Sequence, residues 1–293
     1  MKKYSKNKLK KKRGLKFLIV LLVILFVVGI ALLSFVLLNK KVVYGKVDNS
    51  AKNVSDDIAS NSYPVLINNL VIGGVYNNTW VSKDRYYNKS KNKASTEINV
   101  YTNEGKAGTY VIKTVNNNPS NNSYNVSIDS TNLIDEYLAV RKSDNNIMQT
   151  TAYRNINVSQ ADIDAVKDAL SYRKLFNSSV KINSKHEVRL SDSVNGTIIC
   201  ATNESKKSNG VYSTVVYVDE RGNASCVKYS YIKDLDDASD WPIYSFKFVG
   251  DINEDGTSEI VIQETKEFEV IYDILEYRNG KFVEVLSAST KIK

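Results

Sequence analysis

Most of the chain alternates apolar and polar positions with the period of a β-strand. From residue 63 to the C-terminus, short runs rich in Tyr, Val, Ile and Thr are separated by turn residues such as Asn, Gly and Asp. This alternation predicts strands with one buried face. The clearest hairpin is FEVIYDILEYRNGKFVEVL, because Asn279-Gly280 suits a two-residue type I′ turn. A second hairpin is expected in GVYSTVVYVDERGNASCVKYSYI, about ERGN.

One segment has helical periodicity instead. In SQADIDAVKDALSYRKLF, residues 159–176, Val166 and Leu170 lie four positions apart on one helical face. Ser159 can cap the N-terminus of this helix, and Asp162, three residues further on, predicts a variant of the capping box. The pattern therefore predicts one helix packed on a sheet.

An uninterrupted apolar run, FLIVLLVILFVVGIALLSFVLL, occupies residues 17–38. As a helix it rises ~33 Å, enough to cross a hydrocarbon core of ~30 Å. Residues 1–16 hold nine Lys or Arg and no acidic residue, which predicts that this tail stays in the cytoplasm. A cleaved signal peptide is the alternative, but its apolar core is usually ~7–15 residues and ends at a small-residue site. We expect an uncleaved transmembrane helix, with the C-terminal part outside the cell.

The region after the predicted anchor divides by composition. Residues 39–62 are polar with isolated apolar positions, which is typical of a stalk. Residues 63–184, which include the predicted helix, and residues 185–293 are expected to form two β-rich domains, with a single fused domain as the alternative. The expected fold class is mainly β with one helix (α+β), an antiparallel β-rich ectodomain behind one N-terminal transmembrane helix.

The formal charge of +8 is concentrated in the basic tail. Without the nine basic residues of that tail, the chain keeps 31 of its 40 Lys and Arg against 32 acidic residues. A folded domain that binds nucleic acid would carry excess positive charge, so we expect no nucleic-acid partner. The expected partner of the N-terminal region is the lipid bilayer. The Lys/Asn-rich composition, with no cysteine for a lipobox, indicates a Gram-positive bacterium.

The residues that could carry catalysis are few. Cys200 and Cys226 are candidates for a disulfide in an exported domain, and the sequence leaves open whether their strands are neighbours. The single histidine, His186, is expected to be a partly exposed strand residue and not the base that a cysteine nucleophile needs. The chain contains no G-x-S-x-G, P-loop or H-E-x-x-H motif. We therefore expect a non-catalytic protein.

The stretch VGDINEDGTSEIVI, residues 249–262, has the oxygen spacing of a cation-binding loop. Calcium takes about six to eight oxygen ligands at ~2.3–2.6 Å, and side chains at alternate loop positions can point inward together. Gly256 permits the sharp bend, and three carboxylates with an amide favour Ca²⁺ over Zn²⁺. A solvated acidic turn is the alternative. The predicted ligands are Asp251, Asn253, Asp255, the carbonyl of Thr257, and Glu259.

This stretch is similar to the calcium loops of FG-GAP and VCBS repeats, which occur in integrin-type β-propellers and in bacterial surface proteins. The similarity covers residues 243–287, the length of one repeat unit. It implies a calcium loop that lies between two strands and organises the structure around it. The repeat pattern, roughly G-D-x-N-x-D-G-x-x-[DE]-[ILV], is matched by Gly250, Asp251, Asn253, Asp255, Gly256, Glu259 and Ile260.

The expected function is binding or assembly at a bacterial cell envelope, with cell-wall glycan or an envelope protein as the partner. Two alternatives stay open. One is an accessory subunit of a secretion or conjugation machine. The other is an extracytoplasmic glycan hydrolase that uses paired carboxylates, such as Glu264 with Glu267 or Asp236 with Asp237. Four aromatic residues are candidates either for stacking on sugars or for filling the core: Trp80, Trp241, Tyr86 and Tyr87.

Overall fold

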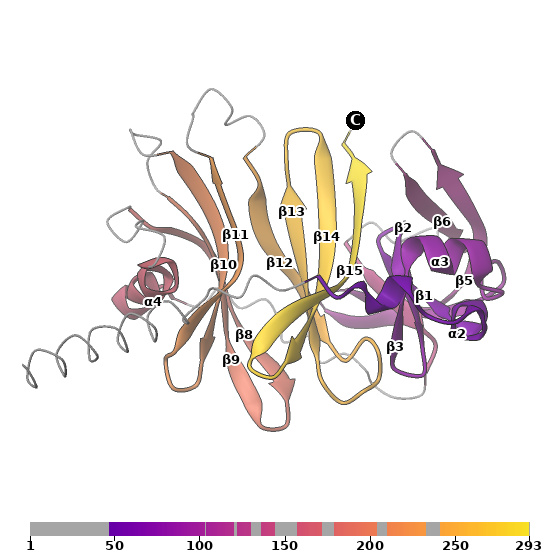
Figure 1. Ribbon diagram of the computed structural model, residues 1–293, viewed down its shortest axis with the longest axis horizontal. Helices are drawn as coiled ribbons and strands as arrows, with labels where there is room; N and C mark the ends of the chain where they lie inside the picture. Colours follow the sequence, from indigo (N-terminus) through magenta and orange to yellow (C-terminus); the bar gives the residue numbers. More distant parts are fainter. Residues whose placement is uncertain are drawn as a thin grey trace, which may run out of the picture. The chain divides into compact units, whose positions relative to one another are not determined.

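Three antiparallel sheets dominate the computed structural model (Figure 1). We refer to them as the barrel sheet, the outer sheet and the central sheet. The structure describes residues 47–102, 104–119, 122–129, 136–143, 157–171, 179–203, 210–232 and 241–292.

The barrel sheet closes on itself. Its strand order is β1-β7-β4-β5-β6-β2-β3, and β1 also pairs with β2, so that six strands form a closed antiparallel ring. Side chains alternate between the two faces of the ring: Leu66 packs inside, while Val65 and Ile67 face outward. The strands are β1 (Tyr63–Ile67), β2 (Leu70–Tyr76), β3 (Thr79–Ser82), β4 (Glu97–Thr102), β5 (Gly105–Asn118), β6 (Ser123–Ile128) and β7 (Leu138–Arg141).

The other two sheets are four-stranded. The outer sheet, in the order β11-β10-β9-β8, contains β8 (Lys181–Ser191), β9 (Val194–Thr202), β10 (Val211–Asp219) and β11 (Ala224–Ile232). The central sheet, in the order β12-β13-β14-β15, contains β12 (Ile243–Gly250), β13 (Glu259–Thr265), β14 (Glu269–Arg278) and β15 (Lys281–Lys291).

Both predicted hairpins are confirmed. Strands β14 and β15 pair from Arg278–Lys281 outward, and Asn279 and Gly280 have φ of 51° and 77°. Positive φ at both central positions is what a type I′ turn requires. Strands β10 and β11 likewise pair on either side of the ERGN segment.

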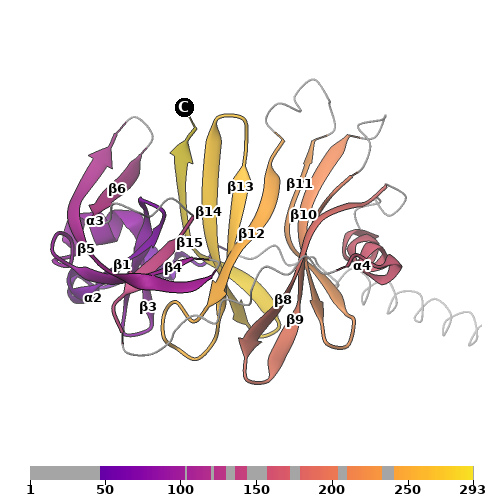
Figure 2. The same cartoon turned by 180° about the vertical axis from the view of Figure 1, so that it is seen from behind.

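The central sheet is buried on both faces. Val261 packs with the barrel sheet, whereas its neighbours Ile260 and Ile262 pack with residues of the outer sheet. Figure 2 shows β12–β15 between the two other sheets. A strand covered on both sides has no polar face, which explains why Ile260, Val261 and Ile262 of β13 are all apolar.

The prediction of an α+β chain with a single helix is wrong. The described residues are mainly β and contain three α-helices, α2 (Asp56–Asn61), α3 (Lys83–Lys89) and α4 (Gln160–Leu170), and a 3₁₀ turn, η1 (Asn49–Lys52). Helices α2 and α3 are too short for a 3.6-residue apolar period to show in the sequence. Ser55 caps α2, since its Oγ accepts from the N–H of Ile58 at 3.3 Å.

The predicted helix and its cap are present in α4. The Ser159 N–H donates to Asp162 Oδ2 at 2.7 Å, and the Asp162 N–H donates to Ser159 Oγ at 3.3 Å. This is the reciprocal arrangement of a capping box. The helix ends at Leu170, and residues 172–176 of the predicted segment lie outside the described residues.

Part of the predicted stalk packs on the domain. Ala51 and Ala59 are buried, and the Asp48 N–H donates to the Glu284 carbonyl at 2.8 Å. The described part of Val43–Lys293 forms one compact unit. Of the helices that the structure describes, none combines the length and apolar character needed to cross a membrane. The predicted span, residues 17–38, lies outside the described residues.

Candidate metal centre

The acidic loop connects β12 to β13 and folds around Asp251. The carboxylate of Asp251 accepts from the N–H groups of Asp255 at 2.9 Å and Gly256 at 2.8 Å. Glu254 and Gly256 have φ of 65° and 90°, a left-handed conformation in which glycine carries no steric cost. The sharp bend predicted at Gly256 is therefore confirmed.

The middle of the loop is held by short-range hydrogen bonds. Asn253 Oδ1 accepts from the Asp255 N–H at 3.1 Å, and Asn253 Nδ2 donates to Asp255 Oδ2 at 3.1 Å. Asp255 Oδ1 accepts from the Thr257 N–H at 2.8 Å. Each carboxylate oxygen has two lone pairs, so these bonds still leave acceptor capacity for a cation.

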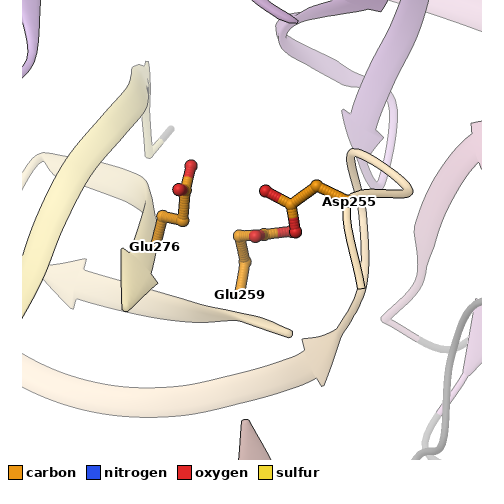
Figure 3. Close-up of side chains that lie close together, drawn as sticks. All are labelled: Asp255, Glu259 and Glu276. Atoms are coloured by element: carbon orange, nitrogen blue, oxygen red, sulfur yellow. The ribbon is translucent and has the colours of Figure 1, made fainter. Parts of the chain in front are cut away.

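Three carboxylates converge beside this loop. Asp255, Glu259 and Glu276 each place one oxygen within 4.8 Å of the others, and Figure 3 shows Asp255 reaching toward Glu259. Ile260 on β13 pairs with Leu275 on β14. Because the strands are antiparallel, continuing this register by one position toward the loop brings Glu259 level with Glu276. Like charges directly opposite each other destabilise a sheet unless a cation or a proton lies between them.

Glu259 is the most constrained of the three. It is 0 % exposed, and its Oε2 accepts from the Ile252 N–H at 2.8 Å. Its Oε1 is buried with no hydrogen-bond partner among the described residues. Burial raises the pKa of Glu259 well above its ordinary value of 4.5, and the nearby carboxylates of Asp255 and Glu276 raise it further.

Glu276 is fixed by partners on its other side. Trp80 Nε1 donates to Glu276 Oε2 at 2.8 Å, and Arg278 Nη2 donates to the same oxygen at 2.7 Å. Arg278 also binds Asp48, with Nη1 at 2.6 Å from Oδ2. These contacts fix the orientation of the Glu276 carboxylate toward the loop, as hydrogen bonds to the ligands do in metal sites.

The site fits a hard cation. Its ligand atoms are carboxylate oxygens, which suit Ca²⁺, Mg²⁺ or Mn²⁺ better than Zn²⁺. The unpartnered Oε1 of Glu259 is a buried acceptor that a cation would satisfy. Of the five predicted ligands, the structure brings Asp255 and Glu259 into the carboxylate group. Asp251 and Asn253 lie in the loop, and their side-chain oxygens accept hydrogen bonds from N–H groups of the loop. The N–H of Thr257 donates to Asp255.

Sequence reasoning missed Glu276. It lies on β14, 17 positions after Glu259, inside the apolar segment IYDILEYR. The available signal was the presence of an acidic residue in a strand that is otherwise buried, since such an acid needs a partner. Only the strand pairing shows which partner it has.

The other candidate residues do not form a second site. Cys200 and Cys226 are both buried and form no disulfide, and they lie on β9 and β11, which flank β10. Two strand spacings separate them by ~9.5 Å, beyond the ~7 Å over which a disulfide can form. His186 is buried and stacks on Phe246 with centroids 4.8 Å apart, and burial lowers its pKa.

The candidate residues for sugar stacking and hydrolysis that the structure describes are mostly buried or already paired. Trp80 and Tyr86 are buried in the core, and Tyr87 stacks on Tyr124 at 4.0 Å. Glu264 is paired with Lys266 at 3.2 Å. Asp236 and Asp237 lie outside the described residues.

Comparison of the chain with protein-family models, curated proteins and solved structures finds no match. The similarity of the acidic loop to FG-GAP and VCBS repeats therefore stays a prediction from the sequence.

Proposed function

We propose that this chain is a membrane-anchored, extracytoplasmic binding or assembly protein of a bacterial envelope, with a structural calcium ion in its central sheet. The observation that carries the calcium proposal is Glu259 Oε1, a buried acceptor without a partner among the described residues, inside a group of three carboxylates. Burying such a charge without compensation is costly, and a bound cation would remove that cost.

Burial favours a structural role over hydrolysis. Glu259 is 0 % and Glu276 is 6 % exposed, so a glycan cannot reach either carboxylate. A glycosidase needs both of its carboxyl groups to reach the scissile bond. A cation bound here would have little contact with any substrate.

The loop also joins the central sheet to the barrel sheet. Asn78 Nδ2 donates to the Glu254 carbonyl at 2.6 Å, and Arg141 pairs with the Glu254 carboxylate at 3.3 Å. A cation that orders the loop would therefore order this junction. The proposed role of calcium is to fix the barrel sheet against the central sheet.

Beside this junction is a surface suited to a polar partner. Tyr63 and Arg141 line an open depression of about 520 Å³ together with other polar side chains. Arg141 lies over the Tyr63 ring, 5.4 Å from its centroid. The Arg141, Lys91 and Lys142 side chains that line it can donate hydrogen bonds to the hydroxyl and carboxyl groups of a cell-wall glycan. The other lining residues are Asn92, Ala94, Ser95, Thr96 and Glu97.

The calcium proposal is tested by calorimetric titration of Ca²⁺ into the full chain in a mild detergent, with thermal melts at each concentration. We expect saturable binding and a melting temperature that rises with free Ca²⁺, because a ligand that binds only the folded state stabilises it. Glu259→Gln should abolish both effects. The matched control is Glu267→Gln, an exposed glutamate near the other end of β13. Absence of binding at millimolar Ca²⁺ would contradict the proposal.

The binding proposal needs a separate assay. The same protein is incubated with insoluble cell-wall glycan, and both the retained protein and the released soluble fragments are measured. Retention that Arg141→Ala reduces supports a binding protein. Release of fragments, lost when one acidic residue is replaced by Ala, would instead indicate a hydrolase.

A further inference from the structure

A lysine on the outer sheet faces the central sheet. Lys228 lies on β11 opposite Val215, and Val215 belongs to the apolar core shared by these two sheets. Directly paired residues of neighbouring strands point to the same face. The Lys228 side chain, 18 % exposed, therefore lies between the two sheets.

Two carboxylates of the central sheet meet this lysine. Asp273 on β14 pairs with Ile262, and Glu284 on β15 pairs with Leu275, both members of the same shared core. Lys228 Nζ lies 2.9 Å from Asp273 Oδ2 and 2.6 Å from Glu284 Oε2. The Asp273 side chain is only 3 % exposed.

This group contains two acids for one base in a largely buried position. Burial, followed by the charge of Asp273, raises the pKa of Glu284. Burial alone would lower the pKa of Lys228, but the two carboxylates outweigh it and the net shift is upward. Lys228 is thus an ammonium at rest, and Glu284 is the carboxylate best placed to take a proton from it.

We propose that Lys228 and Asp273 condense into an amide that crosslinks the outer sheet to the central sheet, with Glu284 transferring the protons. The Lys228 ammonium first gives a proton to Glu284. The neutral Nζ then attacks Cγ of Asp273 while Glu284 returns that proton to an Asp273 oxygen, giving a tetrahedral carbon. A nitrogen proton passes through Glu284 to the same oxygen, which leaves as water. One ammonium and one carboxylate become one amide and one water, and Glu284 ends unchanged.

Proximity and burial both favour this condensation. Fixed intramolecular groups react with effective molarities that reach about 10⁵–10⁸ M, and strands of two packed sheets hold these groups in contact. The reaction also removes two charges from a poorly solvated position, where an ion pair gains little over a neutral structure. The product amide N–H keeps Glu284 as its acceptor.

The test is the mass of the full chain after denaturation. A condensed chain is lighter than its sequence mass by one water, about 18 Da. Tryptic digestion localises the loss, because an acylated Lys228 resists cleavage. We expect a branched peptide in which residues 222–233 are joined to residues 267–278 through Lys228 and Asp273.

Variants separate this crosslink from dehydration elsewhere. Lys228→Arg should restore the full sequence mass, and Asp273→Asn should lose ammonia, about 17 Da, instead of water. Glu284→Gln keeps both joined groups, and we expect it to slow condensation about 100-fold, the usual contribution of a proton-transfer group. Lys247→Arg is the matched control, because Lys247 forms an ordinary ion pair with Glu136 at 3.0 Å, and it should keep the loss.

Two results would overturn the proposal, and the first needs only the unaltered protein. A full sequence mass with no branched peptide, after prolonged incubation of the folded chain, would show that the three residues form only an ion-pair group. A mass loss that persists in Lys228→Arg would place the modification elsewhere and would overturn it equally.

Discussion

Glu259 and Glu276 lie on neighbouring strands, one position beyond the paired residues Ile260 and Leu275, and one carboxylate oxygen of each lies within 4.8 Å of the other and of Asp255. Two acids in such a position are unfavourable at neutral pH without a counter-charge. Arg278 and Trp80 compensate Glu276. Glu259 receives only the N–H of Ile252 from the described residues. The unfavourable charge is therefore concentrated on Glu259.

Glu259→Gln tests this conclusion directly. Gln is the neutral isostere, and its side-chain oxygen can still accept from Ile252. In the absence of divalent cations, we expect the free energy of unfolding to rise by about 1–3 kcal/mol, the cost of a buried group without its partners. Urea unfolding of the full chain in EDTA, with and without the substitution, measures this difference.

Addition of Ca²⁺ should make the unaltered chain more stable to unfolding than Glu259→Gln. The unaltered chain gains stability from the ion, whereas Glu259→Gln has lost a charged ligand and gains little. If the variant is the less stable protein in EDTA, the Glu259 carboxylate is stabilising by itself and the site does not need a cation.

Trp80→Phe tests how Glu276 is held. Phenylalanine keeps most of the buried ring of Trp80 but removes the indole N–H that donates to Glu276 at 2.8 Å. The loss of one hydrogen bond to a buried charge predicts a decrease of about 1.5–3 kcal/mol in the free energy of unfolding. Trp241→Phe is the control, because the indole N–H of Trp241 has no partner among the described residues. Equal losses in the two variants would indicate a packing effect instead of a lost hydrogen bond.

The capping box of α4 gives a pH-dependent prediction. Burial alone would raise the pKa of Asp162, but the hydrogen bonds from Lys185 and Ser159 outweigh it and lower the pKa below 3.8. A folded-state pKa below the unfolded value means stability that is present above pH 3.8 and lost as the pH falls through the folded-state pKa. Asp162→Asn should therefore lower stability at neutral pH by about 1–2 kcal/mol.

The difference between Asp162→Asn and the unaltered chain should shrink as the pH falls below 3.8, because the Asp162 carboxylate then gains a proton and becomes neutral, as Asn is at every pH. Urea unfolding across this range measures it. The exposed Asp164→Asn serves as control, with an expected change within about 0.5 kcal/mol. A difference that stays constant with pH would mean that the charge of Asp162 contributes nothing.

The features that the sequence predicted correctly are local ones. The Asn279-Gly280 turn, the Ser159 cap and the bend at Gly256 each depend on the conformation of a few consecutive residues. Such preferences can be recognised without knowing the rest of the fold. Asp255 and Glu259 lie only four residues apart, so the sequence could place them near each other, and their role as metal ligands stays a prediction.

The features that were missed depend on contacts between distant segments. Glu276 reaches the loop only because β14 pairs with β13, and Lys228 meets Asp273 only because the outer and central sheets pack face to face. Helices α2 and α3 are stabilised by packing, as the burial of Ala59 and Tyr86 shows, more than by their own sequence pattern. Neither strand pairing nor sheet packing can be read from one sequence.

The packing of the barrel sheet on the central sheet depends on the absence of a side chain at Gly73. A Cβ added there would lie 2.6 Å from the Val81 carbonyl oxygen and 2.7 Å from a methyl of Leu286 on β15. The carbonyl belongs to the paired strand β3 and cannot move without disturbing the sheet. We therefore expect Gly73→Ala to lower the free energy of unfolding by about 1–3 kcal/mol, the usual cost of overpacking. Gly108→Ala is the control, since its nearest neighbour would be the Tyr110 ring at 3.1 Å, on an exposed part of β5. Thermal unfolding that is equally affected by both substitutions would show that the contact between Gly73 and Leu286 does not limit how closely the two sheets pack.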